Sequence, residues 1–441
     1  MSIEIIPLGG FSEVGRNAVA IKVDEEVVIC DLGLMLDKYI EYTDTDEPIE
    51  ISGRKLIEVG AAPDVGILGD LRKNVVGICI SHGHLDHVGA VPYLANQFDA
   101  DIHATPMTCE VIKNLTVRDR RPIKNRIVQH PINSKFKLTK NIEVEFIHIT
   151  HSIPHTVAVT LHTPYGTVIY MNDFKIDNHP MLGQKSNLKR LKELEGAKCL
   201  IIDSLYAHLP EKAPSERFAQ EMLFDTVLNT DTKGKAVVIT TFSSHIARLK
   251  AIVELGHKMR RRVVFLGRSM DKYLTAAENA GLVDFKKKVK IVAGRAQVDT
   301  WLKRNPNLSN VLLVMTGHQG EPKAVLARTI DQGLLKLGSG DLVVYSCKII
   351  PVEVNIENRH RLDERLRQQH VRIFNDIHVS GHGAREDHRE LLTLLKPEHL
   401  IPTHGGMRQL GALKELAVHD LGYKPENVHI LANGQRLKIV E

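Results

Sequence analysis

Residues 81–94 read SHGHLDHVGAVPYL and directly follow the apolar run VVGICI at residues 75–80. The run has the length and the β-branched content of a buried strand. Four potential metal ligands then occur within six residues: His82, His84, Asp86 and His87. They cannot share one face of a helix, but at the turn after a strand they can reach two ions. Imidazole and carboxylate are the ligands that zinc prefers when thiolates are absent, so the segment predicts a metal centre.

Further candidate ligands share a pattern in which an apolar strand ends in a single His or Asp. They are Asp31 after VVIC, His151 after FIHIT, Asp173 after VIYMN and His404 after LIPT. The repeated pattern predicts that all of them lie on one rim of a sheet sandwich. A lone histidine is more often an ordinary core or surface residue, so these positions gain their meaning from the six-residue cluster.

Composition and length narrow the class of protein. The chain has 441 residues, which exceeds the usual size of one hydrophobic core and predicts two domains. It has no apolar run of the about 18 residues that a membrane span needs, and no secretory signal at its N-terminus. We therefore expect a cytoplasmic protein without a membrane partner. The five scattered cysteines are expected to be reduced core residues.

The pattern along the chain changes twice. Residues 1–205 consist mainly of short apolar runs broken by turn signals. From residue 206 to residue 359 helical and strand patterns alternate, which is typical of a parallel sheet. Residues 360–441 return to the first style. We therefore expect an α/β fold in which residues 1–205 and 360–441 form one domain and residues 206–359 form an inserted α/β domain of mainly parallel sheet.

The candidate ligands together resemble the metallo-β-lactamase superfamily, which has an αββα sandwich and a HxHxDH motif. The resemblance implies two zinc ions, one held by His82, His84 and His151, the other by Asp86, His87 and His404, with Asp173 bridging them. Asp31 resembles the aspartate that orients ligands near the first strand turn. Manganese can occupy the same nitrogen and oxygen sites.

The inserted segment resembles the β-CASP domain of nucleic-acid nucleases. Asp203, His382 and His404 are similar to that group's motifs A, B and C. Two further stretches resemble ribonuclease J: LGG with EVGRN within residues 8–17, and TGHQGEP at residues 316–322. Bacterial members carry an extra C-terminal domain, so the compact form of this sequence resembles the archaeal ribonuclease J group. The start of the fold near Ile3 makes a second archaeal group less fitting. The archaeal cleavage-and-polyadenylation-factor group usually carries N-terminal KH-type domains.

This resemblance implies a 5′-to-3′ exoribonuclease that prefers a 5′-monophosphate on single-stranded RNA, sometimes with endonuclease activity, in RNA decay or processing. The candidate catalytic residues are His382, Asp203, His378 and the ligand Asp86. We expect His382 to donate a proton to the leaving oxygen or to contact the phosphate, and His378 with Ser380 to seat that phosphate. A purely structural hydrogen bond is the alternative role for His378.

Polar residues follow several strands of the inserted segment, where ligands bind in open parallel sheets and where helix starts favour anions. Serine, threonine and glycine are also ordinary caps and turn formers. With the resemblance, these loops are candidates to bind the 5′-phosphate through short donors and one arginine. The candidates are Ser243, Ser244, Arg268, Ser269, Gly317, His318, Gln319 and Gly320.

Three other functions share parts of this pattern. A small-molecule metallohydrolase, such as a lactonase or thioesterase, needs the metal motif but not the insertion. A non-catalytic scaffold would lose ligands, whereas here every ligand position is filled. A β-CASP nuclease that only cuts internally or acts on DNA is not distinguished, because recognition of the 2′-hydroxyl leaves no motif. The net charge of +5 suits a polyanionic partner. Family members often form homodimers, and the sequence identifies no exosome, ribosome or other RNA-decay partner.

Overall fold

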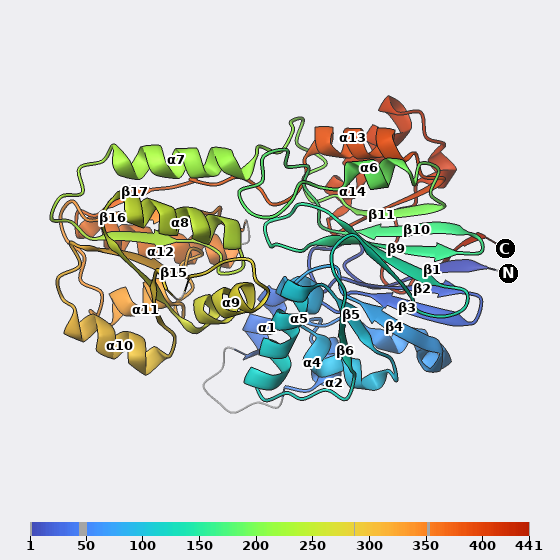
Figure 1. Ribbon diagram of the computed structural model, residues 1–441, viewed down its shortest axis with the longest axis horizontal. Coiled ribbons are helices and arrows are strands. Elements are labelled where there is room, and N and C mark those ends of the chain that lie inside the picture. Colours follow the sequence, from blue (N-terminus) through green and yellow to red (C-terminus); the bar gives the residue numbers. More distant parts are fainter. Residues whose placement is uncertain (1, 44–50, 286, 351–352, 441) are drawn as a thin grey trace. The chain divides into compact units, whose positions relative to one another are not determined.

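The computed structural model describes residues 2–43, 51–285, 287–350 and 353–440 (Figure 1). The chain forms two compact units. The first unit comprises Met1–Asn178, Gln184–Ala213 and Gly381–Glu441, and the second unit comprises His179–Gly183 and Pro214–Ser380.

The first unit contains two sheets (Figure 1). One has the strand order β19-β1-β2-β3-β4-β5-β6. Its strands are β1 (Ile3–Gly9), β2 (Ala18–Val23), β3 (Glu26–Cys30), β4 (Val75–Cys79), β5 (Ile102–Ala104), β6 (Ile127–Gln129) and β19 (Leu437–Val440). The other has the order β18-β11-β10-β9-β8-β7. Its strands are β7 (Ser134–Lys137), β8 (Glu143–His148), β9 (Val157–Thr163), β10 (Gly166–Met171), β11 (Cys199–Asp203) and β18 (His399–Thr403).

The two sheets pack face to face, and helices lie on their outer faces (Figure 1). Between the sheets, Ile21 and Val28 of one sheet belong to the same buried cluster as Phe146 of the other. A second cluster joins the outer face of the β7–β11, β18 sheet to helices through residues such as Leu200 and Leu391. The helices of this unit are α1 (Leu36–Thr43), α2 (Gly53–Glu58), α3 (Leu85–Val88), α4 (Val91–Leu94), α5 (Pro106–Lys113), α6 (Leu188–Lys192), α13 (Arg385–Leu395) and α14 (Met407–Glu415). The layering is that of the predicted αββα sandwich.

The second unit is built on one sheet with the order β14-β13-β15-β12-β16-β17, in which all neighbouring strands are parallel. Its strands are β12 (Val237–Thr240), β13 (Arg262–Leu266), β14 (Lys290–Val292), β15 (Val311–Met315), β16 (Leu342–Tyr345) and β17 (Arg372–Phe374). Its helices are α7 (Glu216–Leu228), α8 (Ile246–Lys258), α9 (Arg268–Asn279), α10 (Arg295–Arg304), α11 (Val325–Asp331) and α12 (Glu353–Gln368). The alternation of helix and strand thus gives a parallel sheet.

The unit boundaries differ from those expected at residues 205/206 and 359/360. Residues 206–213 lie with the first unit, and residues 360–380 lie with the second. The reason for the later boundary is that α12 continues to Gln368 and is followed by β17, which pairs with β16 as the edge strand of the second unit's sheet. A charged helix and a three-residue edge strand give little hydrophobic pattern to detect.

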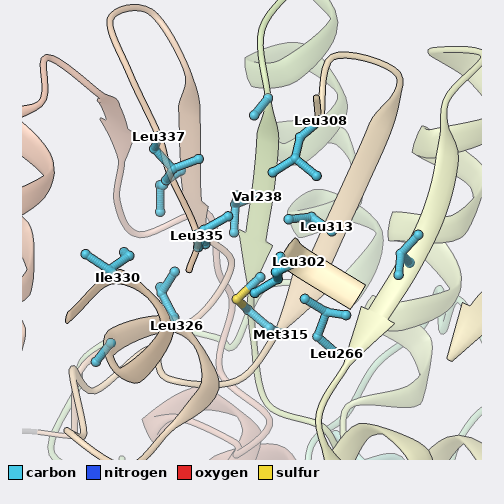
Figure 2. Close-up of a cluster of buried hydrophobic side chains, with 14 of the residues drawn as sticks. Val238, Leu266, Leu302, Leu308, Leu313, Met315, Leu326, Ile330, Leu335 and Leu337 are labelled. Carbon is cyan, nitrogen blue, oxygen red and sulfur yellow. The ribbon is translucent and has the colours of Figure 1, made fainter. Parts of the chain in front are cut away.

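A leucine-rich core stabilises the second unit (Figure 2). Leu313 lies on the central strand β15, is fully buried, and shares its cluster with Leu266 and Met315. Replacing Leu313 with alanine is expected to lower the free energy of unfolding by about 2–5 kcal/mol, since it removes transfer energy and leaves a cavity. Chemical denaturation measures this loss. Leu228→Ala is the control, because that side chain is 46% exposed. A loss no larger than that of the control would contradict the assigned packing.

The five cysteines are all buried and unpaired, as expected for reduced core residues. Burial raises the pKa of the Cys109 thiol to about 12, so that group stays protonated near neutral pH. Among the described residues, no helix combines the length and the apolar character needed to cross a bilayer.

Candidate metal centre

The predicted ligands come from strand ends that share one edge of the sandwich. Strands β3 and β4 are parallel neighbours, and Asp31 and His82 follow them closely. In the second sheet β10, β11 and β18 are mutually parallel, and β8 runs in the same direction because both β8 and β10 are antiparallel to β9. The carboxyl ends of these strands therefore meet at one edge. The candidates at this edge are His151 after β8, Asp173 after β10, Asp203 at the end of β11 and His404 after β18.

One group of potential ligand atoms brings together three histidines and Asp173. The Nδ1 atom of His84 lies 3.1 Å from Nε2 of His82 and 3.1 Å from Nε2 of His151. Oδ2 of Asp173 lies 3.5 Å from Nε2 of His82 and 3.4 Å from Nε2 of His151. Three imidazole nitrogens and one carboxylate oxygen that converge in this way form a four-ligand set of the kind that binds zinc.

A second group consists of Asp86, His87 and His404. Oδ2 of Asp86 lies 3.4 Å from Nε2 of His87 and 4.0 Å from Nε2 of His404. The other carboxylate oxygen of Asp173, Oδ1, lies 3.3 Å from Nε2 of His87. Asp173 therefore presents one oxygen to each group. That Oδ1 atom is buried and has no hydrogen-bond partner, which is costly for a carboxylate oxygen unless a cation satisfies it.

The ring nitrogens that face away from the two groups each have a partner. In His82, Nδ1 lies 2.9 Å from Ser81 Oγ, and in His87 it lies 2.7 Å from Asp31 Oδ2. In His151, Nδ1 lies 2.7 Å from the Gly381 carbonyl oxygen, and in His404 it lies 2.9 Å from Asn17 Oδ1. Such contacts fix the ring orientation and leave Nε2 directed to the metal position. Ser152 Oγ lies 3.4 Å from Nε2 of His84, which leaves the Nδ1 atom of that ring for the centre.

Asp31 is the hub of this supporting network. Besides His87 it accepts hydrogen bonds from the backbone N–H and the hydroxyl of Ser81, at 2.7 and 2.8 Å, and from the Tyr170 hydroxyl at 2.9 Å. Both Asp31 and His404 have left-handed backbone conformations, with φ of 63° and 54°. Non-glycine residues adopt this conformation at a cost, and they do so mostly where a functional site over-determines the geometry.

The electrostatics of the cluster favour a cation. Burial lowers the pKa of His84 and of His151 well below the usual value, so these rings are neutral, which is the ligand form. Burial also opposes charge on His87, but the carboxylates of Asp173, Asp86 and Asp31 outweigh it and raise the pKa of His87. Buried carboxylates thus draw positive charge into the centre, and a divalent ion can supply it.

His382 and Asp203 form a hydrogen-bonded pair beside the ligands. Nδ1 of His382 lies 2.8 Å from Oδ2 of Asp203, and Nε2 lies 3.9 Å from Oδ2 of Asp173. Burial lowers the pKa of His382, but Asp203 and Asp173 outweigh burial and raise it to about 9. Asp203 is itself held by the Leu205 N–H, at 2.7 Å from Oδ1. The pair therefore keeps a proton-carrying imidazole next to the metal ligands.

The candidate 5′-phosphate residues lie in the second unit, at the carboxyl edge of its parallel sheet. Ser243 and Ser244 follow β12, Arg268 and Ser269 begin α9, and residues 317–320 follow β15. Strands β12, β13 and β15 are neighbours in the sheet, so these loops share one edge. The structure therefore gathers these loops at one edge of the second unit.

Part of the residue 317–320 loop is fixed by packing. The Gln319 side chain donates to the Lys348 carbonyl at 3.3 Å and accepts from the Ile350 N–H at 2.9 Å. A Cβ at Gly320 would lie 2.4 Å from the Asn358 backbone, so a larger residue does not fit there. Gln319 and Gly320 therefore have a structural role, because they maintain the conformation and packing of the loop.

Three histidines of the second unit, His245, His318 and His378, carry buried ring nitrogens without hydrogen-bond partners in the described chain. Both ring nitrogens of His318 and Nδ1 of His245 and of His378 are in this state. Burial, with a contribution from Arg359, lowers the pKa of His318 to about 3, and burial with Arg248 lowers that of His378 to about 2. A purely structural hydrogen bond was the alternative role for His378, and Nδ1 of His378 makes no such bond in the described chain. His378 and Ser380 belong to the second unit, whereas His382 belongs to the first.

Several residues that orient the ligands were not predicted from the sequence. Ser81 precedes the first ligand and Asn17 ends the EVGRN stretch, so both were quoted without a role. Tyr170 and the carbonyl of Gly381 gave no signal, because an aromatic residue in a strand and a backbone oxygen are not distinctive in sequence.

The sandwich and the histidine–aspartate centre define a hydrolase of the metallo-β-lactamase superfamily, and residues 12–205 match the model of that superfamily. Residues 234–360 match the model of "Ribonuclease J, beta-CASP domain" and residues 370–431 that of the "Zn-dependent metallo-hydrolase RNA specificity domain". The chain belongs to the ribonuclease J family. The family and the fold class predicted from sequence are thereby confirmed, and membership implies the use of a divalent metal.

Curated relatives cover the chain almost end to end. It is 40% identical to "Ribonuclease J" of Methanocaldococcus jannaschii over 99% of each chain, and 38% identical to that of Pyrococcus abyssi over 99% of this chain and 97% of the relative. "Ribonuclease J 1" of Streptococcus pyogenes is 30% identical over 99% of this chain and 74% of its own length. A crystal structure of a protein of unknown function from Enterococcus faecalis shares the fold, with a TM-score of 0.69 and 17% identity over 99% of this chain and 100% of that one.

Proposed function

We propose that this chain is a two-zinc ribonuclease that degrades single-stranded RNA from a 5′-monophosphorylated end. The observation that carries the proposal is the position of Asp173, whose two oxygens face two separate groups of ligand atoms beside the His382–Asp203 pair. RNA as the substrate is supported by the match to the RNA specificity domain and by the names of the relatives.

Each part of the centre has a separate role in the proposed reaction. When bound, divalent ions lower the pKa of a coordinated water and neutralise charge on phosphoryl oxygens. His382 holds a proton at Nε2 and passes it to the leaving oxygen, while Asp203 accepts the hydrogen bond from Nδ1 and keeps the ring charged and oriented. Asp173, which links both ligand groups, fixes their separation. Zinc is favoured over manganese because imidazoles dominate both groups.

The preference for a 5′-monophosphate rests on the second unit. A phosphate oxygen is a strong acceptor that the serine hydroxyls and Arg268 can recognise. In the 317–320 loop the N–H groups of Gln319 and Gly320 donate to Glu321 and Gly317, so recognition by this loop rests on Gly317 and His318. The unpartnered ring nitrogens of His318 and His378 add further polar groups that lack a protein partner. Internal cleavage is compatible with the same centre, since it needs the metal ligands and the His382–Asp203 pair but no recognition of an end.

The test uses one RNA oligomer with a 5′-monophosphate, a 5′-triphosphate or a 5′-hydroxyl, labelled at its 3′ end and incubated with zinc-loaded protein. We expect the monophosphorylated RNA to be shortened from its 5′ end at least about tenfold faster than the other two. His84→Ala, which loses a ligand of the first group, is the inactive control. Equal internal cleavage of all three RNAs would make the enzyme an endonuclease. Hydrolysis of a thioester or lactone without any RNA cleavage would overturn the assignment of RNA as the substrate.

A further inference from the structure

We infer that Asn17 is a positioning residue for the second metal position, which it builds by joining His404 to the Asp86–His87 turn. The inference rests on the two-metal centre of the proposed function and adds a role for the EVGRN stretch. Asn17 is only 1% exposed. It reaches both partners within hydrogen-bond distance, although they lie 69 and 387 residues away in the sequence.

Asn17 bonds to both partners, through its side-chain amide and its backbone N–H. Its Nδ2 donates to the Asp86 carbonyl at 3.0 Å, and its backbone N–H donates to the same carbonyl at 2.9 Å. Its Oδ1 lies 2.9 Å from Nδ1 of His404. The amide thus bridges the turn that carries two ligands of the group and the loop that carries the third.

These bonds determine where His404 carries its proton. A carbonyl oxygen can only accept, so the atom of the Asn17 amide that faces the Asp86 carbonyl must be the NH₂ group. The oxygen Oδ1 then faces His404, and Nδ1 of His404 must donate to it. Nε2 of a neutral His404 consequently keeps its lone pair, on the side where Asp86 Oδ2 lies. Nδ2 of Asn17 also lies 3.1 Å from Nε2 of His87, the candidate ligand atom of that ring, so the amide contacts a second residue of the group directly.

The loop before Asn17 holds the amide in this position. The Gly10 carbonyl accepts hydrogen bonds at 2.9 Å from the backbone N–H of His404 and from the Thr403 hydroxyl. Gly10 has φ of +84°, and a Cβ there would lie 2.4 Å from Oδ1 of Asn17. Glu13 closes the loop, since its carboxylate accepts from the Gly10 N–H at 3.0 Å. The glycine is therefore required both by its backbone conformation and by the close approach of the amide.

The effect of Asn17 should be confined to one of the two ligand groups. The first group is oriented by Ser81 and by the Gly381 carbonyl, and Asn17 makes no hydrogen bond to His82, His84 or His151 in the described structure. Removing the amide should therefore weaken the second ion and spare the first. A general loss of folding would not separate the two positions in this way.

The experiment measures zinc bound per chain in the full-length protein across a series of buffered free-zinc concentrations. For Asn17→Ala we expect the weaker zinc to lose about 10- to 100-fold in affinity, the usual effect of losing a group that orients a ligand. The tighter zinc should keep its wild-type affinity. His404→Ala supplies the reference for a chain with a disabled second position, and Asn17→Ala should approach its stoichiometry of one.

Asn125→Ala is the matched control. Its amide also donates to two backbone carbonyls, those of Phe98 and Ala100, but to no ligand residue, so two zinc ions should remain bound. If Asn17→Ala does not fold, Asn17→Asp replaces it, because the isosteric carboxylate lacks the NH₂ donor; the second zinc should then bind at least about tenfold more weakly. Unchanged affinity for both ions in either folded variant would overturn the inference while the wild type still binds two. A wild type that binds no zinc would overturn the metal centre itself.

Discussion

An Asp173→Ala chain is expected to bind neither zinc ion tightly and to cleave RNA about a thousandfold more slowly, or worse. The reason is geometric. Asp173 faces Nε2 of His82 and His151 through one oxygen and Nε2 of His87 through the other. Loss of a single preorganised electrostatic group in an active site already costs about 10²- to 10³-fold in rate. Removal of the one carboxylate shared by both ligand groups should cost at least as much.

Two measurements check the Asp173 prediction: zinc bound per chain and the initial rate of RNA cleavage. Asp24→Asn serves as the control, since Asp24 accepts hydrogen bonds from the Ser2 N–H and the Tyr165 hydroxyl and belongs to neither ligand group. It should keep two ions and full activity. Asp173→Ala with two zinc ions at wild-type affinity would show that the carboxylate does not bridge the groups, and the proposed centre would then have to be redrawn.

The candidate ligand set could be predicted from the sequence because its decisive part is local. Four ligands within the HGHLDH stretch need no knowledge of the tertiary structure to be seen together. Single ligands such as His151 and His404 were recognisable only as strand ends that matched the cluster. The parallel and antiparallel pairing of the strands then explains why these ends meet.

The supporting groups could not be predicted in the same way. The Gly381 carbonyl that orients His151 lies 230 residues from it in sequence, and the Tyr170 hydroxyl that binds Asp31 lies 139 residues away. A backbone oxygen or a tyrosine in a strand acquires such a role only from the packed structure. The same limitation moved the boundary of the second unit, because β17 is defined by its pairing with β16 and not by its three residues.

The TGHQGEP loop shows a further limit of motif reading. Its residues 317–320 were predicted together to bind phosphate, yet Gln319 and Gly320 have internal structural roles, whereas His318 has ring nitrogens without partners in the described chain. A motif can thus combine residues that build a loop with residues that are free to bind. The comparison of RNAs with different 5′ ends tests the residues that are free to bind. Only the contacts in the folded chain distinguish them from the residues that build the loop.

His382→Ala is expected to lower the turnover number for RNA cleavage by about 10²- to 10⁴-fold, the usual contribution of a positioned general acid, while both zinc ions stay bound. Both ligand groups have their ligands without this ring, since Asp173 and His404, which also lie near His382, each belong to a group that does not include it, and Nδ1 of His382 is engaged by Asp203. His399→Ala is the control, because that histidine pairs with His429 away from the centre and should keep full activity.

The pH profile separates a proton donor from a residue that merely contacts phosphate. The charge of Asp203 raises the pKa of His382, so the protonated, active form persists to higher pH and is lost as the pH rises through that pKa. Asp203→Asn removes the charge and should move the alkaline limb of turnover to lower pH. An alkaline limb that stays in place in Asp203→Asn would exclude His382 as the acid. A His382→Ala chain that hydrolyses a small ester normally but no longer cuts RNA would locate the histidine in phosphodiester chemistry alone.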